Sequence, residues 1–173
     1  MGRCIMKQMQ DRFAREQFAE WFDAQFGESK KQKSKGQSVF LIAGAPGAGK
    51  TTYVQKKKCK SDLVVDLDTL AAALQGVSDP HPDYKTVMDA VLAAREAIYH
   101  TIENRSGTWE NAYVITSNPN PFAVNELAKR LDAKLVYIKP SEQECCEQVK
   151  NDHTRLNKAN DLRLVAEWYK LNS

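Results

Sequence analysis

The stretch GAPGAGKTT, residues 44–52, constrains the fold more than any other part of the sequence. It follows an apolar run, SVFLIA, whose β-branched and aromatic residues are typical of a buried strand. Gly44, Gly47 and Gly49 let the backbone after this strand curl, so that successive N–H groups point inward. The positive end of the following helix then lies behind the loop. The strand, loop and helix together therefore predict an anion-binding site.

Residues 44–51 fit the pattern GxxxxGK[ST], in which loop N–H groups cradle the phosphates of a nucleotide. Lys50 is predicted to reach the β- and γ-phosphates of ATP, the Thr51 hydroxyl to ligate Mg2+, and Thr52 to add an oxygen contact. The predicted nucleotide-binding residues are Gly44, Ala45, Pro46, Gly47, Ala48, Gly49, Lys50, Thr51 and Thr52. The alternative, a glycine-rich turn that binds nothing, is disfavoured by the complete match between a strand and a helix.

Two acids, Asp66 and Asp68, close the next apolar run, VVDLDTL. Ligands of open α/β sheets bind beyond the carboxyl ends of the strands, so both carboxylates are expected beside the γ-phosphate. One of them can hold the metal or its waters. The other can orient an acceptor hydroxyl and accept its proton. The alternative is that Asp68 only caps the helix TLAAAL, because Asp is a favoured N-cap residue.

Four apolar runs, SVFLIA, LVVDL, AYVIT and KLVYI, alternate with helical patterns. Strands that are continuously apolar are expected where helices cover both faces of a parallel sheet. The sequence therefore predicts a three-layer α/β/α fold with a central, mainly parallel sheet. Further helices are predicted over residues 83–103, from a capping box of Ser141 and Glu144 toward Lys150, and roughly over residues 162–171.

The net charge of +3 is concentrated in residues 1–37, which contain eight Lys and Arg against five Asp and Glu. Apolar residues at helical spacing over residues 6–26 predict an amphipathic helix, and a polar basic linker follows it. We therefore divide the chain into residues 1–37 and one domain, residues 38–173. The helix either docks on its own domain or binds a partner protein. The linker is either solvated or contacts nucleic acid or an acidic partner.

No stretch of the sequence approaches the ~18 uninterrupted apolar residues that a membrane span needs. The first ten residues lack the apolar centre of a secretory signal. The four cysteines form no CxxC pair, as is usual for reduced thiols. We therefore expect a cytoplasmic protein with no membrane partner.

GAPGAGKT followed by VVDLD resembles the P-loop phosphotransferases of the zeta-toxin, polynucleotide-kinase and chloramphenicol-phosphotransferase type. It especially resembles the small P-loop proteins that bacteriophage and prophage genomes often encode. The likeness covers most of residues 38–170 and implies a kinase-like P-loop NTPase domain with the loop strand in the middle of its sheet. It also implies that Asp68 is the catalytic base, that Asp66 is a metal-side partner, and that a basic lid lies near the start of the last helix.

The sequence departs from this family in two places. The third apolar run, AYVIT, ends in Thr116 and carries no Asp, so Asp66 would have to replace the usual Walker B acid. The predicted lid, KNDHTRLNKANDLR, offers only Lys150, Arg155 and Arg163. Arg155 best fits a charge-neutralising finger, and the alternative is an arginine that faces solvent.

Two residues are candidates for the acceptor side of the site. Arg95 shares the apolar stripe of its helix, where a guanidinium needs an anion or a carboxylate. It either grips the acceptor, or its stem passes the core and its charge pairs within the fold. His81 lies between two prolines on a stiff loop that could overhang the site. The alternative is an ordinary exposed loop histidine.

These residues support two functions. The first is a Mg-ATP-dependent kinase that moves the γ-phosphoryl group to a hydroxyl or phosphate of a small molecule or of a nucleotide end. The second is an ATP-binding or ATP-hydrolysing module of a phage or DNA-processing assembly, which engages its partner through residues 1–37. The missing acid at Thr116 and the sparse lid favour the second function, and the pair of Asp66 and Asp68 favours the first.

Overall fold

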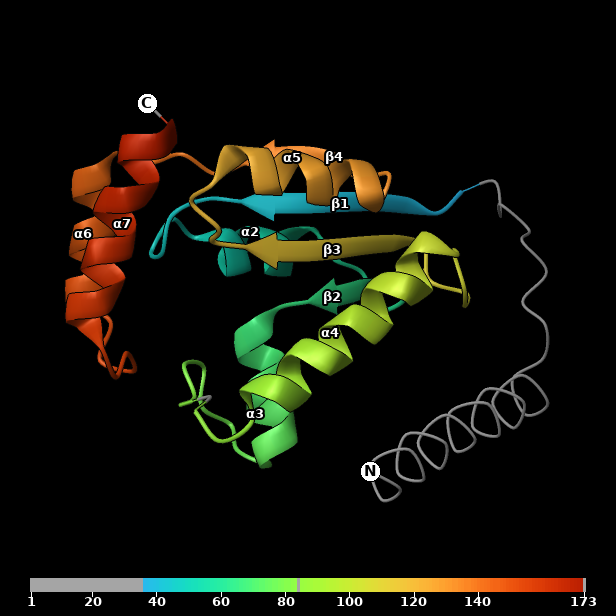
Figure 1. Cartoon of the computed structure of the whole chain (residues 1–173), viewed down its shortest axis with the longest axis horizontal. Helices are drawn as coiled ribbons and strands as arrows, with labels where there is room; N and C mark the ends of the chain where they lie inside the picture. The colour runs from blue at the N-terminus through green and yellow to red at the C-terminus, as the bar shows by residue number, and fades with distance from the viewer. Residues whose placement is uncertain (1–35, 84, 173) are drawn as a thin grey trace, which may run out of the picture. The chain divides into compact units, whose positions relative to one another are not determined.

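The structure is a computed structural model that describes residues 36–83 and 85–172. The predicted N-terminal helix and almost all of the basic linker lie outside these residues, so the helix and the boundary at residue 37 stay predictions. The helices and strands are, in chain order, β1 (Ser38–Ala43), α2 (Lys50–Lys57), β2 (Leu63–Val65), α3 (Leu67–Gln75), α4 (Met88–Glu103), β3 (Asn111–Thr116), α5 (Pro121–Arg130), β4 (Lys134–Tyr137), α6 (Glu142–Asn151) and α7 (Lys158–Asn172) (Figure 1).

The four strands form one parallel sheet in the order β2-β3-β1-β4. The strand that precedes the glycine-rich loop, β1, is interior and pairs with both β3 and β4. Ala43 at its end lies opposite Thr116 of β3, so the carboxyl ends of these two strands are adjacent. The four predicted strands and the position of the loop strand inside the sheet are confirmed.

Helices cover both faces of this sheet (Figure 1). On one face, α4 and α5 pack against side chains of β1 and β3, with Ile102 and Val124 buried among them. On the other face, Val54 of α2 packs against Ile42 and Ile115. The predicted three-layer α/β/α architecture is therefore confirmed.

The last two helices, α6 and α7, pack against the glycine-rich loop. Ala45 and Ala48 of the loop share a buried cluster with Val149 of α6 and Trp168 of α7. The predicted capping box opens α6, because the Ser141 hydroxyl accepts from the backbone N–H of Glu144. No helix among residues 36–83 and 85–172 is long and apolar enough to cross a membrane.

Three predicted boundaries were wrong. The second strand ends at Val65 rather than near Leu67, because Asp66 already accepts the first backbone hydrogen bond of α3. The helix predicted from residue 83 begins at Met88, after a turn in which Asp83 accepts from the backbone of Lys85. The last helix begins at residue 158 rather than 162 and ends at residue 172.

No position was predicted from the sequence for one helix, α5. Its start carries a local signal that would have revealed it. The Asn120 side chain accepts from two backbone N–H groups of the first turn, and Pro121 occupies the first helical position.

Candidate active site

The predicted phosphate loop, residues 44–52, comprises the segment 44–49 that joins β1 to α2 and the first turn of α2, and Gly47 packs closely against α6. Gly47 and Gly49 have positive φ angles of 74° and 83°, which favour glycine. A Cβ atom on Gly47 would also lie 2.6 Å from the carbonyl oxygen of Cys145 in α6. The loop therefore depends on glycine for its curl, and on close packing with α6 for its position.

Lys50, the first residue of α2, is only 7% exposed. Its Nζ donates to the carbonyl oxygens of Gly44 and Ala45, at 2.9 and 2.7 Å. Burial lowers the pKa of Lys50 from 10.5 to about 8, because the charged ammonium is removed from water. Both Thr51 and Thr52 are exposed at the first turn of the same helix, where their hydroxyls are accessible.

Charged side chains from two other parts of the chain act on Lys50. The charges of Asp66, Arg155 and Asp68 all act on the Lys50 ammonium, Asp66 most strongly of the three. Two of these groups belong to the end of β2 and the start of α3, and Arg155 belongs to the lid segment, residues 150–163. The structure therefore brings together Lys50, Asp66, Asp68 and Arg155 out of the predicted site residues.

The two acids occupy different positions at the start of α3. Asp66 is the N-cap residue, and its Oδ2 accepts from the Thr69 hydroxyl at 3.2 Å. Burial, followed by the negative charge of Asp68, raises the pKa of Asp66. Asp68 lies in the first turn, so the interpretation that Asp68 caps this helix was wrong.

Thr116 separates these acids from the phosphate loop. It ends β3, which lies between β1 and β2 in the sheet. With neighbouring strands about 4.8 Å apart, the ends of β1 and β2 are separated by about 10 Å. Thr116 therefore ends the strand next to β1, and Asp66 follows the strand beyond it.

His81 and Arg155 contact the acids of this region. The Nδ1 atom of His81 lies 3.2 Å from Oδ2 of Asp68, and its Nε2 lies 3.1 Å from Oδ2 of Asp152. Arg155 donates to Asp152 at 3.1 Å and to Asp161 at 2.8 Å. His81 is thus not a freely exposed loop residue, and Arg155 does not simply face solvent.

Arg95 and Arg163 make their contacts elsewhere. The Arg95 guanidinium lies 5.5 Å from the centre of the Tyr99 ring and pairs with Glu96 at 3.3 Å. Arg163 is exposed and pairs with Glu167 in its own helix. Neither belongs to the group of charges that act on Lys50.

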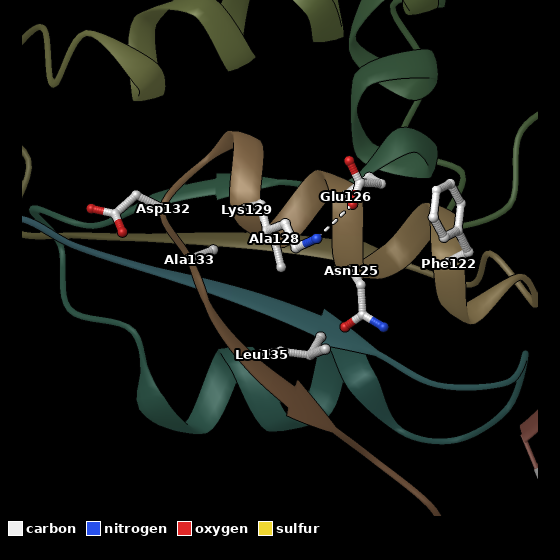
Figure 2. Close-up of a pocket in the computed structure, with 8 residues that line it drawn as sticks. All are labelled: Phe122, Asn125, Glu126, Ala128, Lys129, Asp132, Ala133 and Leu135. Atoms are coloured by element: carbon white, nitrogen blue, oxygen red, sulfur yellow. Dashed lines mark hydrogen bonds and ion pairs between the residues drawn. The ribbon is translucent and has the colours of Figure 1, made fainter.

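A pocket of about 490 Å³ lies between α5 and β4, and no residue of the phosphate loop lines it (Figure 2). Its wall carries an ion pair between Lys129 and Glu126 at 2.8 Å, and Phe122 and Leu135 supply apolar surface. This pocket is therefore separate from the predicted phosphate-binding residues.

No family model and no curated protein matches this sequence. Among solved structures, a chain of the Pnkp1/Rnl/Hen1 RNA repair complex is similar over 83% of this chain and 48% of its own length, with a TM-score of 0.58 and 15% identity. The chain thus spans about half the length of that protein. At this identity the likeness shows the fold alone, which is the parallel α/β/α fold described above. Shikimate kinase from Acinetobacter baumannii, solved with shikimate, is similar over 82% of this chain and 83% of its own, with a TM-score of 0.47 and 15% identity.

Asp152 and Asp161 are the residues of this region that the sequence did not reveal. Both contact Arg155, and Asp152 also contacts His81. A weak local signal exists, because Asp152 and Arg155 are three residues apart just after α6. Nothing in the sequence indicates the contact with His81, which lies 71 residues away.

Proposed function

We propose that this chain is a Mg-ATP-dependent phosphotransferase that moves the γ-phosphoryl group to a hydroxyl or phosphate of a small molecule or of a nucleotide or nucleic-acid end. The observation that carries the proposal is the burial of the Lys50 side chain. In the contacts described above, its ammonium donates only to carbonyl oxygens of its own loop. Arg155 adds a second positive charge close enough to lower the pKa of Lys50 further. A polyphosphate between the two cations would relieve their repulsion and supply charged acceptors for both.

The phosphate loop would hold the phosphates through its N–H groups, and Lys50 would turn from the loop carbonyls to the β- and γ-phosphates. No group of three or more His, Cys, Asp or Glu side chains within residues 36–83 and 85–172 could form a metal site by itself. This fits Mg2+, which binds through one or two protein oxygens together with substrate phosphates and waters. Thr51 would supply one such oxygen, and Asp66 would hold the waters of the metal.

Asp68 is the proposed base, because it lies in the first turn of α3, beyond the N-cap residue Asp66 to which we assign the metal side. It would orient the acceptor hydroxyl and accept its proton during in-line transfer. Arg155 would neutralise the charge that develops on the transferred group. To do so it must exchange its contacts with Asp152 and Asp161 for phosphate oxygens.

Thr116 favours a second candidate function. A threonine beside the loop leaves the metal with fewer protein ligands than a Walker B acid would give it. The chain would then bind or slowly hydrolyse ATP as a module of a larger assembly, such as a phage or DNA-processing complex, with residues 1–37 as the predicted contact.

Transfer from γ-labelled ATP separates the two candidates. The acceptors to test are nucleosides, nucleoside monophosphates, 5'-hydroxyl oligonucleotides and sugars. The wild type should label at least one of them, and Asp68→Asn should bind ATP but label none. If ATP binds, no acceptor is labelled, and the rate of ATP hydrolysis is the same in Asp68→Asn, the second candidate is correct and Asp68 is not a base.

A further inference from the structure

His81 joins two carboxylates that come from different parts of the fold. Its ring lies between Asp68 of α3 and Asp152, which follows the last residue of α6. The backbone N–H of His81 also donates to Asp79 at 2.8 Å, which fixes the loop that carries the ring. The side chain is 23% exposed, so it is held by these contacts and not by burial in the core.

Both ring contacts can be hydrogen bonds only if the ring offers two donors. A neutral imidazole has one N–H and one lone pair, whereas the charged ring has an N–H on each nitrogen. Asp152 is firmly an acceptor. Hydrogen bonds from Thr154, aided by His81, lower the pKa of Asp152 to about 2. The ring therefore bridges the two carboxylates through its two nitrogens, at 3.2 Å from Asp68 and 3.1 Å from Asp152.

The His81 ring connects the two residues to which we assign chemistry. From Asp68 the contacts run through His81 to Asp152, and from Asp152 to Arg155, with each step between 3.1 and 3.2 Å. Without the ring, Asp68 and Asp152 would face each other as like charges, and each would turn toward a cation. The orientation of Asp68 would then no longer be linked to that of Arg155.

We propose that His81 is a positioning residue, which holds Asp68 toward the acceptor and couples it to Arg155 through Asp152. The catalytic part of this inference rests on the proposed phosphotransferase function. The clamp formed by Asp68, His81 and Asp152 does not depend on the proposed function. It can therefore be tested even if the protein has no phosphotransferase activity.

The clamp is tested by double-mutant cycles on the midpoint of thermal unfolding. His81→Ala is combined with Asp68→Asn and, separately, with Asp152→Asn. The midpoint of each double variant should fall by less than the sum of the decreases in its two single variants. Either single change already breaks the contact, so the second change has no contact left to break. His153→Ala is the matched control. It is an exposed histidine next to Asp152, and its effect should add to that of Asp152→Asn. Additive effects in both His81 cycles would overturn the clamp.

The positioning role is tested by steady-state kinetics with whichever acceptor the labelling assay identifies. His81→Ala should lower kcat by about tenfold to a hundredfold, less than the loss of a general base itself, and should leave the KM for ATP within about twofold. His81→Gln, which keeps one N–H donor, should recover part of kcat, and His153→Ala should behave as wild type. An unchanged kcat in His81→Ala would overturn the positioning role while leaving the proposed function intact. If the wild type binds ATP but labels no acceptor, the proposed function is wrong, and the positioning role is wrong with it. This holds even if the double-mutant cycles confirm the clamp.

Discussion

Replacing Lys50 with methionine is expected to stabilise the ligand-free protein at pH 7 and to abolish its affinity for ATP. The lysine is buried, and its pKa falls from 10.5 to about 8. At neutral pH the Lys50 ammonium therefore stays charged in a buried position, where the loss of hydration destabilises the folded protein. Methionine fills a similar volume without the charge, so the variant separates the cost of the buried ammonium from its use in binding phosphate.

The size of the effect follows from the pKa shift. A depression of about 2.5 pH units corresponds to about 3 kcal/mol at pH 7, since each unit is worth about 1.4 kcal/mol. The Lys50→Met variant also loses the two hydrogen bonds to Gly44 and Ala45, each of which contributes about 1 kcal/mol to stability. The net gain is about 1 kcal/mol, which raises the unfolding midpoint of a chain of this length by about 3 °C.

The gain should depend on pH in a defined direction. The pKa of Lys50 is lower in the folded than in the unfolded state, so between about pH 8 and 10.5 the unfolded state binds more protons. The stability of the wild type therefore rises by about 1.4 kcal/mol per pH unit in this window, and the advantage of the methionine variant disappears near pH 9.

Thermal unfolding of Lys50→Met and wild type from pH 7 to 9.5 measures this difference directly. Lys56→Met is the control, because Lys56 is exposed on the same helix and should show almost no effect at any pH. A Lys50→Met protein that is less stable than wild type at pH 7, or a difference that does not change with pH, would refute the reasoning.

Four more substitutions test other parts of the structure. Gly47→Ala should lower the free energy of unfolding by about 3 kcal/mol or more, measured by thermal unfolding, because its Cβ would meet Cys145 and its φ is positive. In Gly49→Ala the φ is also positive but the Cβ meets no atom within 4 Å, so the loss should be only about 1 kcal/mol. Ser141→Ala should lower the free energy of unfolding by about 1 kcal/mol, measured in urea, by removing the cap of α6. Asp66→Asn should raise the Mg2+ concentration for half-maximal ATP binding by about tenfold, measured by calorimetry. An unchanged requirement would remove Asp66 from the metal side.

The phosphate loop and the sheet around it could be predicted because their signals are local. The pattern from Gly44 to Thr51 lies between a strand and a helix, and each of the four strands lies in an apolar run. The capping box of Ser141 and Glu144 is equally local, and the structure contains it. In each case neighbouring residues carry enough of the stabilising contacts to define the conformation.

The boundary of α4 and the contacts of His81 could not be read in this way. The apolar side chains recur at helical spacing from Val87 onward, but the helix begins only at Met88. The residues before it form a turn, in which Asp83 accepts a hydrogen bond from the backbone of Lys85. The contact between His81 and Asp152 depends on how two loops meet, and no spacing along the sequence encodes that meeting. Side chains that act through long-range ion pairs are therefore found only when the fold is known.

Calorimetric titration of the protein with ATP in the presence of Mg2+ tests the central claim most directly. The claim is that the phosphate loop grips the phosphates of ATP with the help of Lys50. The account predicts one ATP per chain for wild type and for Lys56→Met, and no measurable binding for Lys50→Met. A wild type that gives no heat and no ATP-induced rise in its unfolding midpoint would contradict it, and so would equal affinities for wild type and Lys50→Met.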